Sequence, residues 1–290
     1  MSLRNILAAT MASIMAIVAL VVPVAGALAA PIKGQPVPWQ IGLQPAATPV
    51  MAEMNAFHNM LLVIITAIAL FVLALMIYVM VRFNAKRNPV PTTNTHNTML
   101  EVLWTVIPII ILVVIAVPSF RLLYYQDTVP EADMTIKAIG QSWQWEYEYP
   151  DEGLSFTSFM LDREDAIAAG EPALLAVDEK VVVPVGKIIR LQITSDDVIH
   201  SWAVPAFGVK MDAVPGRLNE TWFLVEEPGI YYGQCSELCG QNHAFMPIAV
   251  EAMLPEDYEA WLVIAREQYA RRDDDSAIDA VQVTAAAEAR

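Results

Sequence analysis

Two long stretches without a charged residue place the strongest limit on how this 290-residue chain can fold. They cover residues 60–81 and 102–120, which are 22 and 19 residues long. A helix needs about 20 apolar residues to cross a hydrocarbon core of about 30 Å. A segment inside lipid must also satisfy its own backbone hydrogen bonds, and a helix does so. The sequence therefore predicts a transmembrane helical hairpin over residues 57–127.

The loop between the two stretches predicts the orientation of the hairpin. It carries Arg82, Lys86 and Arg87, and no acidic residue lies between Arg82 and Glu101. Cytoplasmic loops of membrane proteins are enriched in such basic residues. We therefore expect this loop in the cytoplasm of a bacterium whose inner (plasma) membrane carries the two spans. The soluble domain and both termini of the mature chain are then periplasmic.

The segments outside the hairpin and the soluble domain have distinct compositions. Residues 1–30 are typical of a secretory signal peptide, in which Arg4 precedes an apolar run that ends in small residues. A third transmembrane helix is the alternative, because this run is long for a signal. The first part of residues 31–56 is rich in proline and polar groups. This composition predicts an extended periplasmic arm over residues 31–56. Residues 269–290 predict a disordered acidic tail.

The charge of the chain is divided unevenly. Residues 128–290 contain 29 acidic and 11 basic residues, a net charge of −18, whereas residues 1–127 carry a net charge of +3. An acidic surface repels the phosphates of nucleic acid and attracts basic proteins. The charge therefore argues against a nucleic-acid partner and favours a basic protein partner.

The soluble half has the pattern of a β-protein. From residue 134 the apolar residues follow a period of two, which is typical of a half-buried strand. One face of this strand is aromatic and contains Trp143, Trp145, Tyr147 and Tyr149. Further short β-rich runs, broken by proline and glycine, follow along the chain. Together they predict a membrane-anchored all-β protein with a sandwich or barrel over residues 128–268.

Both cysteines of the chain lie in one segment, residues 231–247, which reads YYGQCSELCGQNHAFMP. The side chains that could bind a metal there are Cys235, Cys239, His243 and Met246. His200 is the candidate for a further ligand, since it is the only other histidine in the acidic half. The alternative is a disulfide, because two cysteines in an oxidising compartment usually pair. The histidines and the methionine favour a metal site.

The types of ligand narrow the choice of metal. Thiolate and thioether donors suit copper, whereas four-coordinate zinc rarely uses methionine. A mononuclear blue-copper site needs one cysteine with two histidines and a weak methionine. A second cysteine is one thiolate too many for such a site, but two copper ions bridged by two thiolates would use both.

This segment resembles the copper A loop of subunit II of the haem-copper cytochrome c oxidases. The resemblance extends upstream through DDVIHSWAVPAFGVKMDAVPGRLNETWF and covers roughly residues 50–268. It implies a two-helix transmembrane hairpin followed by a cupredoxin-like Greek-key β-barrel that holds a dinuclear copper A centre. The ligands that it implies are His200, Cys235, Glu237 through its backbone carbonyl, Cys239, His243 and Met246. The side chain of Glu237 would reach a magnesium ion shared with subunit I.

The resemblance implies a role for two further residues. Trp143 matches the tryptophan that receives the electron from cytochrome c. Glu101 matches a glutamate at the mouth of a proton pathway into subunit I. A carboxylate at a helix N-terminus also interacts favourably with the helix dipole, so Glu101 has a structural alternative.

The function implied is that of the electron-accepting subunit of a proton-pumping cytochrome c oxidase. It would take electrons from cytochrome c and pass them to haem in subunit I for oxygen reduction. Its partners would be subunit I, other oxidase subunits, cytochrome c and membrane lipid. A membrane-anchored module that carries or stores copper or zinc is the alternative from a different functional class.

Overall fold

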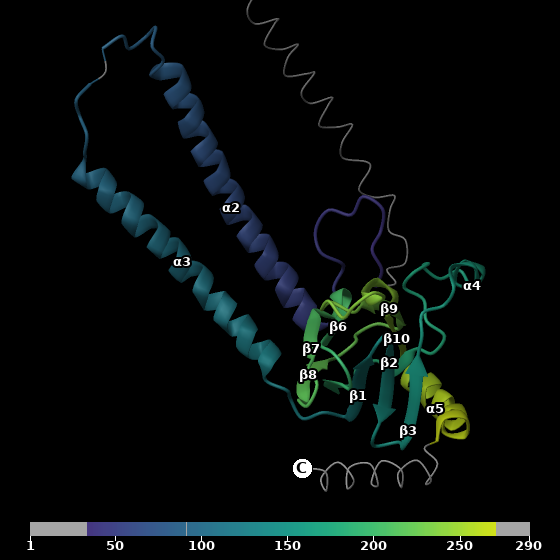
Figure 1. The fold of residues 1–290 in the computed structure, drawn as a ribbon. Helices are drawn as coiled ribbons and strands as arrows, with labels where there is room; N and C mark the ends of the chain where they lie inside the picture. Colours follow the sequence, from purple (N-terminus) through teal and green to yellow (C-terminus); the bar gives the residue numbers. More distant parts are fainter. Residues whose placement is uncertain (1–33, 91, 271–290) are drawn as a thin grey trace, which may run out of the picture. The chain divides into compact units, whose positions relative to one another are not determined.

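The computed structural model describes residues 34–90 and 92–270. The predicted signal peptide lies outside these residues, and so does most of the predicted acidic tail. The described chain forms two long helices followed by a domain of short strands, residues 134–270, which we call the β-domain (Figure 1). The prediction of a helical hairpin followed by an all-β domain is confirmed.

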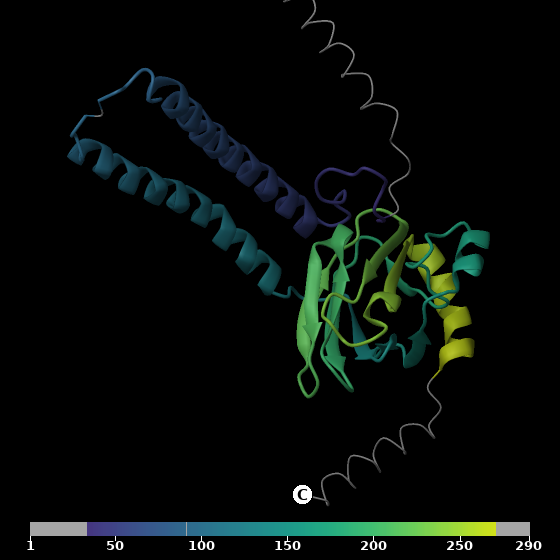
Figure 2. The same cartoon turned by 45° about the horizontal axis from the view of Figure 1, so that its top comes forward.

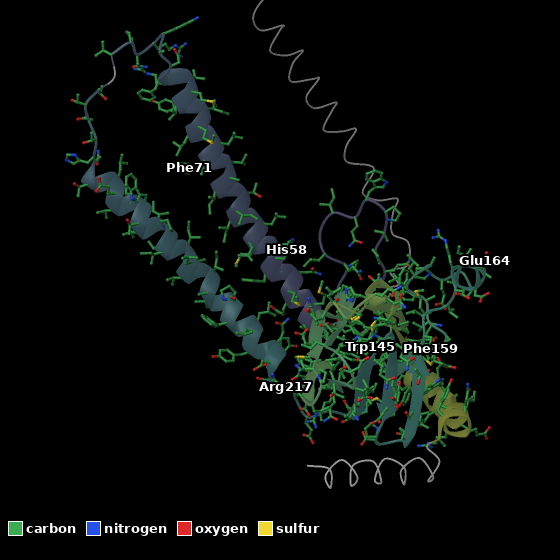
Figure 3. The ribbon with its side chains drawn as sticks, in the orientation of Figure 1. His58, Phe71, Trp145, Phe159, Glu164 and Arg217 are labelled. Atoms are coloured by element: carbon green, nitrogen blue, oxygen red, sulfur yellow. The ribbon has the colours of Figure 1, made fainter. Side chains whose placement is uncertain are left out.

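The hairpin consists of helix α2, Pro49–Arg82, and helix α3, Thr98–Asp127. Each begins after a polar residue, Thr48 or Asn97, whose side chain accepts a hydrogen bond from a backbone N–H of the first turn. Within the described residues, these are the two helices whose length and composition would allow them to cross a membrane. Their apolar side chains, such as Phe71 in the middle of α2, stand out from the helices (Figure 3). Such surfaces suit contact with lipid.

The predicted arm is shorter than expected, because residues 49–56 belong to α2. The hydroxyl of Thr48 donates to the carbonyl of Phe207 at 2.7 Å, and Thr48 itself is fully buried. Met51, one turn into the helix, is only 3% exposed. The first turn of α2 is therefore held by contacts with the β-domain. These contacts join residues about 160 positions apart, so local composition gave no sign of them.

The β-domain contains ten strands in its described residues. They are β1 Met134–Gln141, β2 Gln144–Tyr149, β3 Leu154–Ser158, β4 Val181–Pro184, β5 Ile189–Ser195, β6 His200–Val204, β7 Val209–Ala213, β8 Asn219–Phe223, β9 Gly229–Gln234 and β10 Pro247–Met253. The helical segments among them are α4 Arg163–Ala168, η2 Pro205–Phe207, η3 His243–Phe245 and α5 Pro255–Tyr269.

The strands form two larger sheets and one separate hairpin in the described chain. One sheet has the order β3-β2-β1-β5-β8, the other has the order β4-β10-β9, and β6 pairs with β7. The antiparallel pairs are β1 with β2, β2 with β3, β5 with β8, β6 with β7 and β9 with β10, whereas β1 with β5 and β4 with β10 are parallel pairs made by crossing connections. Strands β7 and β8 lie on one side of this domain and α5 lies on the other (Figure 2). The buried space between the sheets is the core.

The aromatic face predicted for residues 143–149 is largely correct. Trp145, Tyr147 and Tyr149 are at most 1% exposed and point into the core, where Figure 3 labels Trp145. Trp143 does not belong to this face, because it lies in the tight turn between β1 and β2. The alternation of aromatic residues extends into this turn. It therefore predicted that the strand includes Trp143, whereas β2 begins at Gln144.

The predicted tail begins too early. Tyr269 is the last residue of α5, and its ring lies 5.0 Å from that of Phe156 between centroids. Ala270 forms a β-bridge with Leu154. These first two residues of the predicted tail therefore pack on the β-domain, and the remainder lies outside the described residues.

Candidate metal centre

Two separate segments bring the candidate ligands together in the β-domain. The connection from β9 to β10 carries Cys235, Cys239 and Met246, with His243 in the short helix η3. His200 opens strand β6. Two backbone hydrogen bonds hold the connection in place. The Cys235 N–H donates to the carbonyl of Met246 at 3.2 Å, and the N–H of Ser236 donates to the carbonyl of Ser201 at 3.0 Å.

The two thiols face each other without forming a disulfide. Their sulfur atoms are 3.8 Å apart, and both cysteines are free and buried. A disulfide bond would need a sulfur–sulfur distance of about 2.05 Å. The arrangement therefore favours the metal site over the disulfide that the cysteines alone would suggest.

The other donors surround this pair of thiols. His200 Nδ1 lies 3.9 Å from Cys235 Sγ, and His243 Nδ1 lies 3.6 Å from Cys239 Sγ. The thioether sulfur of Met246 is 3.5 Å from Cys239 Sγ. The backbone carbonyl of Glu237 is 3.3 Å from Cys235 Sγ, whereas its side chain is exposed. Each thiol is thus flanked by one imidazole and by one weaker donor.

Asp197 orients His200, and the sequence analysis did not identify it. Its carboxylate accepts a hydrogen bond from His200 Nε2 at 2.8 Å, which leaves Nδ1 directed at Cys235. Metal-binding histidines commonly donate their second ring N–H to a carboxylate in this way. Burial raises the pKa of Asp197, but hydrogen bonds from Ser142 and His200 outweigh burial and hold this pKa below its ordinary value.

The thiols differ in how readily they ionise. Burial raises the pKa of Cys235, but hydrogen bonds with His200, with the backbone of Glu237 and Ser201, and with His243 together outweigh burial and lower this pKa to about 6. Burial and the nearby charge of Cys235 raise the pKa of Cys239. The thiolate is the form of cysteine that binds metal. Cys235 therefore supplies the first thiolate, and a cation would favour ionisation of the second.

A glycine makes room for the imidazole of His200. A Cβ atom added at Gly140 would lie 2.9 Å from two carbons of the His200 ring, closer than unbonded carbon atoms pack. On another side of the imidazole lies the ring of Trp145, with centroids 6.0 Å apart. The imidazole is fully buried as a result. Sequence reasoning missed Gly140, because its effect depends on a contact across 60 residues of chain.

Trp143 connects the surface to the thiols. Its indole N–H donates to the backbone carbonyl of Cys239 at 3.2 Å. Its ring also lies over Gly240, where an added Cβ would be 3.2 Å away. The tryptophan is partly exposed, although it borders the buried core. The indole of Trp143 therefore links the surface to Cys239 through one hydrogen bond and the covalent bonds of Cys239 itself.

The donor set fits copper. It offers two thiols, two imidazoles, a thioether and a carbonyl oxygen, and the two sulfurs with His200 form a compact group whose ligand atoms lie within 4.8 Å of one another. Soft sulfur donors with imidazoles are typical of copper sites. The cysteines, His200 and Met246 are buried, so water has little access to these four side chains, whereas His243 is half-buried.

The family of the chain follows from comparison with known sequences. The family described as "Cytochrome C oxidase subunit II, periplasmic domain" matches residues 134–253, and "Cytochrome C oxidase subunit II, transmembrane domain" matches residues 36–122. The chain belongs to the cytochrome c oxidase subunit II family. The predicted membership of this family is thereby confirmed, and so is the predicted cupredoxin-like fold of the β-domain.

Relatives in this family are similar over most of their length. "Probable cytochrome c oxidase subunit 2" of Rickettsia bellii is 51% identical over 85% of this chain and 91% of its own. "Cytochrome c oxidase subunit 2" of Cereibacter sphaeroides is 48% identical over 81% of this chain and 83% of its own. The crystal structure of the periplasmic domain of subunit II (CoxB) of Bradyrhizobium japonicum is 52% identical. It covers 49% of this chain and 100% of its own, with a TM-score of 0.46. The family matches and the two full-length relatives make this chain a membrane-anchored subunit of a haem-copper oxidase complex.

Glu101 lies apart from the metal centre. It occupies the first turn of α3, at the end that adjoins the loop between the two spans. Its backbone carbonyl accepts a hydrogen bond from Thr105, and its side chain is half-buried. The structure thus separates Glu101 from the thiols by the length of α3.

Proposed function

We propose that this subunit receives electrons from cytochrome c at a dinuclear copper A centre and passes them to haem in subunit I. The observation that carries the proposal is the pair of free, buried thiols 3.8 Å apart, each flanked by one imidazole. One mononuclear copper would leave a thiol unused. Two bridged copper ions would use every donor of the cluster.

The chain's own residues divide into bridging and terminal ligands. Cys235 and Cys239 would bridge the ions, while His200 and His243 would each bind one through Nδ1. Two weaker donors complete the set. Met246 Sδ lies near Cys239, and the Glu237 carbonyl lies near Cys235. When bound, the two copper ions would take up and release one electron with the charge shared between them. Burial and the Asp197 hydrogen bond keep the ligands fixed, which lowers the cost of reorganisation.

We also propose that the side chain of Glu237 binds a magnesium ion shared with subunit I. Its exposed carboxylate is free to face a partner subunit, because the backbone carbonyl of the same residue faces Cys235. Carboxylate oxygens are the ligands that magnesium prefers in proteins. One residue would then join the copper centre to the boundary with subunit I.

The chain would be oriented with its β-domain in the periplasm. The basic residues of the loop between α2 and α3 favour a cytoplasmic loop, since the positive-inside rule applies to short loops. Residues 1–30 would act as a signal peptide, and the two ends of the mature chain would then be periplasmic. Cytochrome c from that compartment would dock near Trp143, drawn by the acidic charge of the domain.

Metal analysis of the purified oxidase, followed by rapid mixing with reduced cytochrome c, tests this function. We expect two copper ions bound by this subunit, a strong visible absorption, and fast reduction of that absorption band by cytochrome c. High salt should slow this reaction, because ions screen charges over about 8 Å at physiological ionic strength. One copper ion in the subunit, or bound zinc without a visible band, would contradict the proposal.

We further propose that Glu101 loads protons from the cytoplasm into subunit I. An ionisable side chain at the edge of a membrane span is costly, and this cost usually signals a function. The first turn of α3 is already capped by the side chain of Asn97, which accepts from the Leu100 N–H at 3.2 Å. The helix therefore does not depend on Glu101 for its cap, which weakens the alternative that Glu101 serves the helix dipole alone.

Replacing Glu101 with alanine should slow steady-state oxygen consumption, because the haem steps that need a proton would wait for it. Copper content and the rate of copper reduction by cytochrome c should stay unchanged, since Glu101 is remote from the thiols. Glu101→Asp should be milder. Glu53→Ala, which removes an exposed carboxylate from the other helix, is the matched control. Wild-type turnover in Glu101→Ala would leave only the dipole role.

A further inference from the structure

The segment before α2 forms a loop that both ends fix to the β-domain. The carbonyl of Gly34 accepts a hydrogen bond from the Tyr232 N–H at 3.0 Å. The N–H of Ala47 donates to the Ala206 carbonyl at 2.9 Å, and its carbonyl accepts from the Glu226 N–H at 3.1 Å. Residues 35–46 between these anchors, which we call the arm loop, stand clear of the strands (Figure 1).

The arm loop exposes apolar side chains at its tip. Trp39 is 97% exposed and Ile41 is 100% exposed, with Val37 and Leu43 nearly half exposed on either side. Residues 34–52 contain no charged side chain. Trp39 adopts a positive φ of 62°, which is uncommon for a bulky residue. A tip of this composition is poorly suited to water, so something else should cover it.

Three hydrogen bonds pair polar groups at the tip of the loop. The side-chain oxygen of Gln40 accepts from the Val37 N–H at 3.2 Å, and its amide donates to the Leu43 carbonyl at 3.0 Å. The backbone N–H of Gln40 donates to the Val37 carbonyl at 3.2 Å. Paired backbone groups lower the cost of moving a loop out of water. These three bonds reduce the number of unpaired polar groups that the tip would carry into a less polar environment.

The position of the loop along α2 identifies that environment. The side chain of Asn55 donates to the carbonyl of Gln44 at 3.3 Å, so this end of the arm loop lies beside the second turn of α2. The uncharged span begins at Met60, five residues further, or about 7.5 Å at the helical rise. The headgroup layer on each side of a bilayer is about 5–7 Å thick. Gln44, near the end of the arm loop, therefore lies level with the outer edge of this layer.

We propose that the arm loop inserts its tip into the interfacial layer of the phospholipid bilayer, with Trp39 and Ile41 in contact with lipid. Tryptophan concentrates at this depth, where its ring meets acyl chains and its N–H meets headgroups. The loop would continue the lipid-facing surface that α2 already presents. It would fix the height of the β-domain above the membrane, because both of its ends are bonded to that domain.

Photocrosslinking in the assembled oxidase, within native membranes, tests this proposal. A diazirine amino acid replaces Ile41 in one variant and Trp39 in another, and mass spectrometry identifies what each captures. Both side chains are exposed, so neither substitution removes a core contact. We expect phospholipid adducts at both positions, in a yield similar to that at Phe71 in the middle of α2. The same residue at Val263, 61% exposed on α5, should capture water alone.

The other outcomes overturn the proposal in distinct ways. Capture of another oxidase subunit at position 41 would mean that a protein covers the tip. Capture of water alone, as at Val263, would mean that the loop stays in the aqueous phase. Neither result depends on the copper centre, so this experiment and the test of the proposed function are independent.

Discussion

Replacing Cys235 with serine is expected to remove both copper ions from the subunit, and with them its visible absorption and the oxidation of cytochrome c. A serine hydroxyl does not ionise at neutral pH, so the two metal ions would lose one of their two bridges. Cys239→Ser should give the same result, because the thiols are 3.8 Å apart and act as a pair. Metal analysis and the visible spectrum of the purified oxidase measure the loss.

Ser236→Ala is the matched control for these two variants. Ser236 lies in the same loop, but its hydroxyl only donates to the carbonyl of Gln234 at 3.1 Å. Its backbone N–H, which holds the loop against Ser201, is kept by alanine. Copper content should therefore remain at the wild-type level. Full copper in Cys235→Ser, or its loss in Ser236→Ala, would contradict a thiolate-bridged centre.

The sequence alone could propose most of the donor cluster, because most of it is local. Cys235, Cys239, His243 and Met246 lie within 12 residues, so one loop determines their relative positions. The contributions of Asp197 and Gly140 depend instead on contacts between β1, the loop before β6 and His200. No local pattern marks a glycine that makes room for an imidazole. The pair Asp196-Asp197 ahead of His200 was the one available signal.

The net charge of the acidic half does not indicate which of its carboxylates are available to a partner. The acidic excess of residues 128–290 suggests a negative docking face. Glu148 contributes little to such a face, since it pairs with Lys137 at 3.3 Å and its side chain is 12% exposed. The carboxylate of Asp178 accepts backbone N–H groups at 2.7 Å and so has a structural role. Asp196, exposed beside the turn that carries Trp143, remains available to a basic partner.

The boundaries of the arm and of strand β2 were missed for a related physical reason. Local composition predicted an extended arm, but contacts of Thr48 and Met51 with the β-domain favour an early start of α2. Alternating aromatic residues predicted that Trp143 lies in a strand, whereas the turn places its ring over Gly240. In both cases a tertiary contact outweighed the local preference.

Replacing Trp143 with phenylalanine should slow electron transfer from cytochrome c to copper by about tenfold or more, equivalent to about 1.4 kcal/mol in the barrier. Phenylalanine retains an aromatic ring but cannot donate to the Cys239 carbonyl, so it breaks the bonded route to the thiol. Copper content and the Michaelis constant for cytochrome c should change little, because the ligands and the acidic surface are intact. Rapid mixing with reduced cytochrome c measures the rate.

Two other tryptophans separate this role from general effects of losing an indole. Trp261→Phe is the matched control, because Trp261 is also partly exposed but packs on Tyr149 and Tyr258. Its rate of electron transfer should equal that of the wild type. Trp145→Phe should destabilise the fully buried core without slowing the transfer to the same extent. A normal rate in Trp143→Phe together with a slow rate in Trp145→Phe would assign the electron route to the buried ring, since Trp145 also contacts His200.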